Sequence, residues 1–180
     1  MTRPWSEADN FARGELDHRI ELVDGHLWPA PTPTMPHQDV SHVLLHSLRA
    51  SARRAGLRAY EGVVLRLDPG RLIVPDLVVA RVDRLATHAD AADTVLVGEI
   101  TSPGNPFAGT PDRIALCAAA RIPWLLLAQP ESADHEALTL RLFQLAAGHY
   151  LEYAAAAPGH TLTSSDPFPF RIRTGDLVAF

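Results

Sequence analysis

The sequence contains no lysine, and all 16 of its basic residues are arginine. This absence excludes every mechanism that needs a lysine as general base, nucleophile or Schiff-base former. Genomic base bias also produces a composition rich in arginine, alanine, leucine and proline, so the missing lysine does not identify a function by itself. The 21 acidic residues give a net charge of −5, which excludes a global positive field that would attract nucleic acid.

Cysteine and long apolar runs are also scarce. The single cysteine, Cys117, excludes an internal disulfide framework and a zinc site built from cysteines. No apolar run approaches the roughly 20 residues of a membrane span, and the first ten residues lack the apolar core of a signal peptide. At 180 residues the chain is long enough to bury one core. We therefore expect one cytoplasmic globular domain over residues 1–180, without a membrane partner.

Hydrophobic spacing and turn residues predict an alternation of strands and helices. The Pro-rich segment 29–36 is expected to lie outside regular structure, because proline fixes φ and removes a backbone donor. Helices are predicted over 39–55 and 110–121, the second with Thr110 as N-cap, and a short helix is predicted at 6–13. Strands are predicted at 20–23, 26–28, 59–67, 72–74, 77–80, 94–100, 123–128, 138–143 and 149–153.

Two carboxylates stand where charge is unusual. Val95, Val97 and Glu99 alternate onto one face of an almost unbroken apolar strand, and Asp76 directly precedes the apolar run 77–80. A carboxylate at the end of a buried strand must be paired, ligated or at the rim. If the two strands are neighbours, both carboxylates converge on a site suited to Mg²⁺. The alternative is that each carboxylate is hydrogen-bonded to a nearby arginine or amide, and the pattern alone slightly favours this alternative.

The order of these motifs resembles the Uma2 family, a group of restriction-endonuclease-like proteins of the PD-(D/E)XK superfamily that is common in bacteria. The resemblance covers roughly residues 5–155. It rests on the segments Glu21-Leu-Val-Asp-Gly25, Pro75-Asp76, Glu99-Ile-Thr-Ser-Pro103 and Ile122-Pro-Trp-Leu-Leu-Leu. It implies an α/β fold with a central mixed β-sheet, flanked here by helices 39–55 and 110–121.

The resemblance also implies a site. Asp76 and Glu99 match the family's two acidic metal ligands, and the Ile100 carbonyl matches its backbone ligand. Glu21 matches an acidic residue of the first motif that can approach the metal through water, and His37 matches a histidine ahead of the long helix. The implied chemistry is hydrolysis of DNA phosphodiester bonds assisted by Mg²⁺ or Mn²⁺, in which the ion activates water and stabilises charge on the phosphate.

The chain departs from the family in the half of the site that carries the lysine. The superfamily's lysine is replaced by Thr101, and the substitute lysine of the following helix is replaced by Arg113. An aspartate and a tyrosine usual in that helix are replaced by Gly109 and Cys117. Arginine cannot act as a base, although it can clamp a phosphate and stabilise transition-state charge.

Two functions therefore remain open: a divalent-metal-dependent nuclease, or a catalytically degenerate nuclease fold that serves as a binding or assembly module. A homodimer is compatible with both, because the fold commonly dimerises. Arg113 is equally compatible with a phosphate clamp and with an ion pair to Asp112 or Glu99.

Three further groups of residues each allow a functional and a structural interpretation. Arginines near the end of the long helix could contact a phosphate backbone, although a solvated basic face is more common. His42 and His46 lie one helical turn apart, and no third metal ligand is identifiable, which favours a polar helix face. The loop 134–136, Asp-His-Glu, is expected to be exposed to solvent. The arginines near the end of the long helix are Arg49, Arg53, Arg54 and Arg58.

Overall fold

The computed structural model describes residues 4–12, 20–30, 32–101 and 112–179. Its largest unit is a six-stranded sheet with the order β11-β10-β9-β8-β6-β3. Only β8 and β9 run parallel, so the sheet is mixed, as predicted. Its strands are β3 (Arg58–Glu61), β6 (Leu77–Ala80), β8 (Thr94–Ile100), β9 (Trp124–Pro130), β10 (Leu138–Ala146) and β11 (His149–Ala156).

A second sheet has five short strands in the order β2-β1-β5-β4-β7, and a separate hairpin pairs β12 with β13. The predicted strand 59–67 is wrong as one element, because its two halves belong to different sheets as β3 and β4. Gly62 lies between those halves with φ +62°, a conformation that favours glycine. The remaining strands are β1 (Ile20–Val23), β2 (His26–Pro29), β4 (Leu65–Asp68), β5 (Arg71–Ile73), β7 (Ala89–Asp90), β12 (Thr161–Ser164) and β13 (Phe170–Arg173).

The helices are α1 (Glu7–Ala12), α2 (Met35–Arg54) and α3 (Arg113–Ala119), with 3₁₀ turns η1 (Ala91–Asp93) and η2 (Thr174–Leu177). α2 begins four residues earlier than predicted, because Thr34 caps it and Pro36 is tolerated in its first turn. α3 begins later than predicted, with Asp112 as N-cap accepting from the Ala115 amide at 3.0 Å. Thr110 lies outside the described residues. In the described ranges no helix has the length and apolarity needed to cross a membrane.

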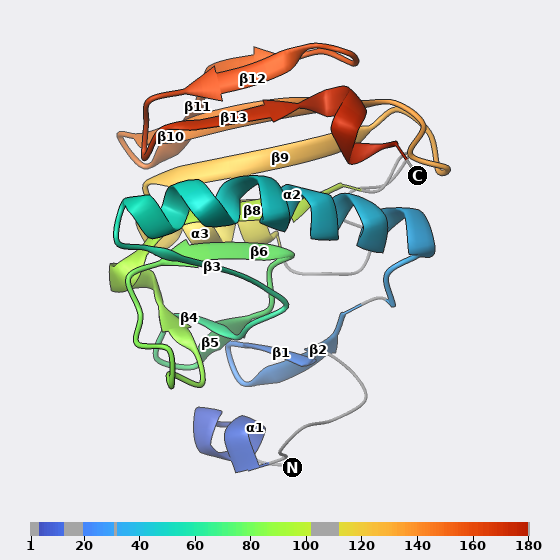
Figure 1. Ribbon diagram of the computed structural model, residues 1–180. Helices are drawn as coiled ribbons and strands as arrows, with labels where there is room; N and C mark the ends of the chain where they lie inside the picture. The colour runs from blue at the N-terminus through green and yellow to red at the C-terminus, as the bar shows by residue number, and fades with distance from the viewer. Residues whose placement is uncertain (1–3, 13–19, 31, 102–111, 180) are drawn as a thin grey trace.

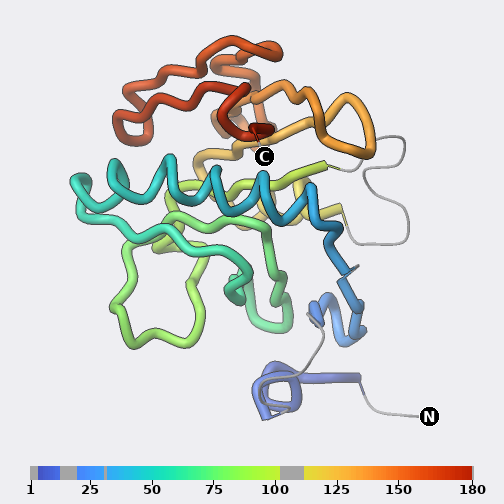
Figure 2. The backbone as a smooth tube through the Cα atoms, turned by 45° about the vertical axis from the view of Figure 1, so that its right-hand side comes forward, coloured from blue at the N-terminus to red at the C-terminus, as the bar shows by residue number. Residues whose placement is uncertain are grey.

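The six-stranded sheet buries a core on each face. Figure 1 shows the arrangement of the elements around it. On one face α2 and the β12–β13 hairpin cover the sheet, and the apolar stripe of α2 packs there through Val40, Leu44 and Leu48. On the other face Val97 and its neighbours pack with α3 and with β4 and β5. The β1–β2 hairpin and α1 lie at the end of the molecule opposite β12 in both ribbon and tube views (Figure 2).

Candidate functional site

The register of the large sheet places Asp76 opposite Glu99. β6 and β8 are antiparallel neighbours, and Leu77 pairs with Gly98. One residue further along each strand, Asp76 and Glu99 face each other on the same side of the sheet. Gly98 permits the close approach, since a Cβ at this position would lie 2.9 Å from the Leu77 Cβ. The two strands are neighbours, which is the condition under which the sequence brings the two carboxylates together.

Asp76 is buried, and hydrogen bonds hold its carboxylate in place. Its Oδ2 accepts from the Ile100 amide at 2.9 Å, and its Oδ1 lies 3.1 Å from Nε2 of His37. Burial alone would raise the pKa of Asp76, but the His37 ring, the Ile100 amide and the Arg113 charge together lower it. Asp76 is therefore ionised at neutral pH, and the first turn of α2 fixes its orientation through His37.

Glu99 is buried beside this carboxylate, and its pKa is shifted in the opposite direction. Its Oε2 accepts from Nη1 of Arg113 at 3.0 Å, whereas its Oε1 is buried without a hydrogen-bond partner among the described residues. Burial, followed by the neighbouring charge of Asp76, raises the pKa of Glu99 from 4.5 to about 8. With this raised pKa the Glu99 carboxyl keeps its proton at neutral pH unless a further cation binds beside it.

Glu21 joins the same cluster from the small sheet. It lies on β1, is 1% exposed, and its Oε1 accepts from the Val74 amide at 3.0 Å. Val74 directly follows β5, and the chain then passes through Pro75 and Asp76 into β6, so this crossing between sheets brings Glu21 to the carboxylate pair. Burial raises the pKa of Glu21, and the charge of Arg113 partly opposes the shift.

Arg113 links two of the three carboxylates. Its Nη1 contacts Glu99, and its Nε lies 2.9 Å from Oε1 of Glu21 as an ion pair whose N–H is not directed at the oxygen. Burial lowers the pKa of the guanidinium, but the charges of Glu99, Glu21 and Asp76 outweigh this and raise it. Arg113 is therefore a permanent cation inside the cluster. Of the two interpretations predicted for it, the ion pair to Glu99 is present in the structure.

The other residues that depart from the family pattern are Cys117, Thr101 and Gly109. Cys117, one turn after Arg113, is buried among apolar side chains, and burial raises the pKa of its thiol. It therefore packs as a small hydrophobe. Thr101 is half-buried directly after β8, and its amide donates to the Ala128 carbonyl at 2.9 Å. Gly109 lies outside the described residues.

The donor set at this site suits a hard cation. In a trans peptide the C=O and N–H groups point in opposite directions. Because the Thr101 amide points to β9, the Ile100 carbonyl points away from β9 and toward the side of β6 and Asp76. Two carboxylates, a backbone carbonyl and water are ligands that Mg²⁺ accepts. Within the described ranges, no three histidine, cysteine or acidic side chains are grouped closely enough to hold an ion by themselves.

His135, near the site, corrects the prediction that the whole loop 134–136 is exposed to solvent. His135 is 4% exposed, although its neighbours Asp134 and Glu136 are exposed as expected for the loop. Its ring centroid lies 6.4 Å from that of His37, and its Nδ1 is buried without a partner among the described residues. His135 also has a φ of +57°, and the polar sequence of the loop reveals neither this conformation nor the burial of the side chain. His42 and His46 are exposed on α2, in agreement with a polar helix face.

Comparisons with known proteins agree with this architecture. The chain is similar to the crystal structure of a protein from Anabaena variabilis, a "putative nuclease belonging to DUF820", with a TM-score of 0.69 and 16% identity over 98% of both chains. At this identity the likeness shows a shared fold. No curated protein matches the chain. The profile of the Uma2 family, described as "Putative restriction endonuclease", matches residues 5–175, and the chain therefore belongs to the Uma2 family.

Proposed function

We propose that this chain is a divalent-metal-dependent nuclease that hydrolyses phosphodiester bonds of DNA. The observation that carries the proposal is the buried Oε1 of Glu99, which has no hydrogen-bond partner among the described residues. Glu21, Asp76 and Glu99 are all buried, and Arg113 supplies one positive charge for them. Burying uncompensated carboxylate charge is costly. A divalent cation at Glu99 and Asp76 removes that cost.

Asp76, Glu99 and the carbonyl of Ile100 would hold the cation, with Glu21 reaching it through water. Bound there, Mg²⁺ or Mn²⁺ supplies an activated water and stabilises charge on the phosphate. His37 keeps the Asp76 carboxylate oriented, as hydrogen-bonded partners of metal ligands commonly do. Arg113 holds Glu99 in place and contributes positive charge near the scissile phosphate, but it cannot remove a proton from water.

A second function is favoured by one specific observation. Arg113 lies between Glu21 and Glu99, so a permanent guanidinium charge already neutralises part of the site. If this charge suffices, the site is a structural ion-pair network, and the chain is a nuclease fold that binds or assembles without catalysis.

Nicking of supercoiled plasmid DNA by the purified protein in Mg²⁺ and in Mn²⁺ distinguishes the two functions. Glu99→Gln and Asp76→Asn remove one ligand each. Their matched controls are Glu152→Gln and Asp24→Asn, which alter exposed carboxylates paired with Arg141 and Arg71.

The nuclease proposal predicts metal-dependent nicking by the native protein and by both controls, with a loss of about 100-fold or more in the ligand variants. Equal nicking by ligand variants and controls would assign the activity to a contaminant, and no nicking in either metal would favour the binding module.

A further inference from the structure

One end of the six-stranded sheet gathers arginines that the carboxylate site does not use. The C-terminal end of α2 turns through Gly56 into β3, so the last turns of the helix lie beside the first residues of that strand. A pocket of about 400 Å³ opens there. Arg49 and Arg53 line it from α2, and Arg58 and Tyr60 line it from β3.

The guanidinium groups at this pocket have few protein partners. All three arginines are exposed, and among the described residues neither Arg49 nor Arg53 forms an ion pair or a side-chain hydrogen bond. Nε of Arg58 donates to the Val82 carbonyl at 3.1 Å, which orients that side chain and leaves its terminal nitrogens for another acceptor. The pocket therefore presents positive charge that no described carboxylate neutralises.

The C-terminal end of a helix carries a partial negative charge, which opposes anion binding. Here the carbonyl groups of the last turn are already engaged, because Ser51, Ala52 and Arg53 accept from the amides of the cap. Three full guanidinium charges also exceed the half charge of a helix dipole. The net charge at the pocket is consequently positive despite its position at a helix C-terminus.

We propose that this arginine pocket binds phosphate groups of a nucleic-acid backbone. The planar fork of arginine matches phosphate oxygens in a bidentate geometry. A chain with a net charge of −5 needs such a local basic surface to approach a polyanion at all. The inference rests on the proposed nuclease function, for which it names the surface that docks the substrate.

The pocket lies far from the carboxylates. β3 and β6 are antiparallel, and Arg58 pairs with Ala80, the last residue of β6. Asp76 directly precedes the first residue of β6, so it lies at the other end of that strand. Along α2, the 16 residues from His37 to Arg53 span about 24 Å. That span corresponds to roughly seven nucleotides of a duplex strand. The pocket therefore contributes to DNA binding and has no part in bond cleavage.

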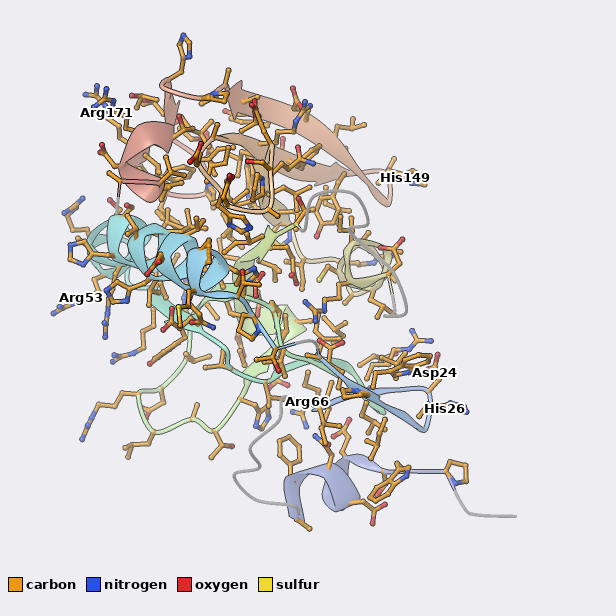
Figure 3. All side chains as sticks on the ribbon, turned by 90° about the vertical axis from the view of Figure 1, so that its right-hand side faces the viewer. Asp24, His26, Arg53, Arg66, His149 and Arg171 are labelled. Atoms are coloured by element: carbon orange, nitrogen blue, oxygen red, sulfur yellow. The ribbon has the colours of Figure 1, made fainter. Side chains whose placement is uncertain are left out.

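The test measures fluorescence anisotropy of a labelled 20-base-pair duplex with the full chain in EDTA, as a function of salt. The variant is the triple substitution Arg49→Gln, Arg53→Gln and Arg58→Gln. A control removes the same charge elsewhere by replacing Arg141, Arg171 and Arg173 with glutamine. Figure 3 shows Arg171 above Arg53, on the β12–β13 hairpin and not at the end of α2. Circular dichroism verifies folding, and the single variants Arg53→Gln and Arg53→Lys replace the triple variant if it does not fold.

We expect the pocket variant to bind the duplex at least tenfold more weakly. Its salt slope should be shallower by about one for each phosphate that the variant no longer neutralises. The control should retain most of the affinity and most of the slope. Equal effects in variant and control, or unchanged affinity in the variant, would overturn the inference.

Inorganic phosphate and poly-glutamate serve as competitors. Displacement of DNA by poly-glutamate at equal charge concentration would assign the pocket to acidic proteins instead. Saturable binding of inorganic phosphate without DNA binding would assign it to a free anion. Binding is measured in EDTA, where a metal-dependent nuclease cannot cut. DNA binding through the pocket, together with no nicking in the separate Mg²⁺ and Mn²⁺ assays, would contradict the proposed nuclease and leave this inference standing.

Discussion

Nη1 of Arg113 lies 3.0 Å from Oε2 of Glu99, so the arginine expected at the position of the family's lysine is paired directly with a buried carboxylate of the candidate site. The same guanidinium contacts Glu21 of the other sheet. One side chain on α3 thereby holds together carboxylates from β1 and β8. The stability of the cluster and the chemistry proposed for it both depend on this contact.

Removing Arg113 should destabilise the protein strongly. Arg113→Ala leaves Glu21 and Glu99 buried without their cation, and breaking a buried pair in this way costs about 3–5 kcal/mol. Arg141→Ala, which breaks the exposed pair with Glu152, should cost no more than about 1 kcal/mol. Urea unfolding at pH 8 in EDTA compares the two variants. Equal losses would show that the buried pairs contribute no more than a surface pair.

The stability of the metal-free protein should fall as pH rises. The pKa of Glu99 is raised from 4.5 to about 8 by burial and by Asp76, so the folded protein binds a proton that the unfolded chain has lost. This contribution is fully present below pH 4.5 and is lost as pH rises through about 8. Relative to Glu99→Gln, which cannot ionise, the native protein should therefore lose stability between these pH values, by an amount on the order of a few kcal/mol.

Unfolding curves of both proteins in EDTA at pH 5, 7 and 9 measure this difference. A constant difference between native protein and Glu99→Gln across the range would show that Glu99 is ionised throughout, with a normal pKa.

His37 should act on metal affinity through Asp76. His37→Ala removes the contact to Oδ1 of Asp76 and one cause of the lowered pKa of that carboxyl. Loss of such a partner typically weakens metal binding about 10–100-fold. The matched control is His149→Ala, because His149 is exposed at the β10–β11 turn (Figure 3). Mn²⁺ affinity equal to that of the control would mean that His37 has no influence on the site.

Gly98 should be intolerant of any side chain. In Gly98→Ala the new Cβ would lie 2.9 Å from the Leu77 Cβ, so β6 and β8 must separate just where Asp76 faces Glu99. We expect a loss of about 1–3 kcal/mol in thermal or urea unfolding. Gly175→Ala is the control, since nothing lies within 4 Å of a Cβ built there. A loss no larger than that of the control would show that the strands adjust freely.

The sequence predicted the elements whose pattern is local. The unbroken apolar run of β8 and the Asp24-Gly25 turn, whose residues have φ +50° and +80°, were both predictable. The start of α2 was missed because prolines suggest irregular structure, although proline is tolerated in the first turn of a helix. The separation of β3 from β4 depends on packing between sheets, which a single strand pattern does not record.

The candidate site was predictable in its residues but not in its connections. The family resemblance pointed to Asp76 and Glu99, and strand order brought them together. Arg113 links Glu99 to Glu21. This link depends on the crossing of the chain from β5 to β6, and no local sequence pattern encodes that crossing. The burial of His135, which has a positive φ, was also not predictable from the polar sequence of its loop.

The most direct test of the central claim is a calorimetric titration of the metal-free protein with Mn²⁺ and Mg²⁺ at pH 8. The account predicts one saturable site in the native protein and in Glu152→Gln, and its loss in Asp76→Asn and Glu99→Gln. Because Glu99 must lose its proton to bind the ion, affinity should also fall by up to about tenfold per pH unit below pH 8. No saturable binding, or equal binding by the ligand variants, would contradict the claim that these carboxylates form a metal site.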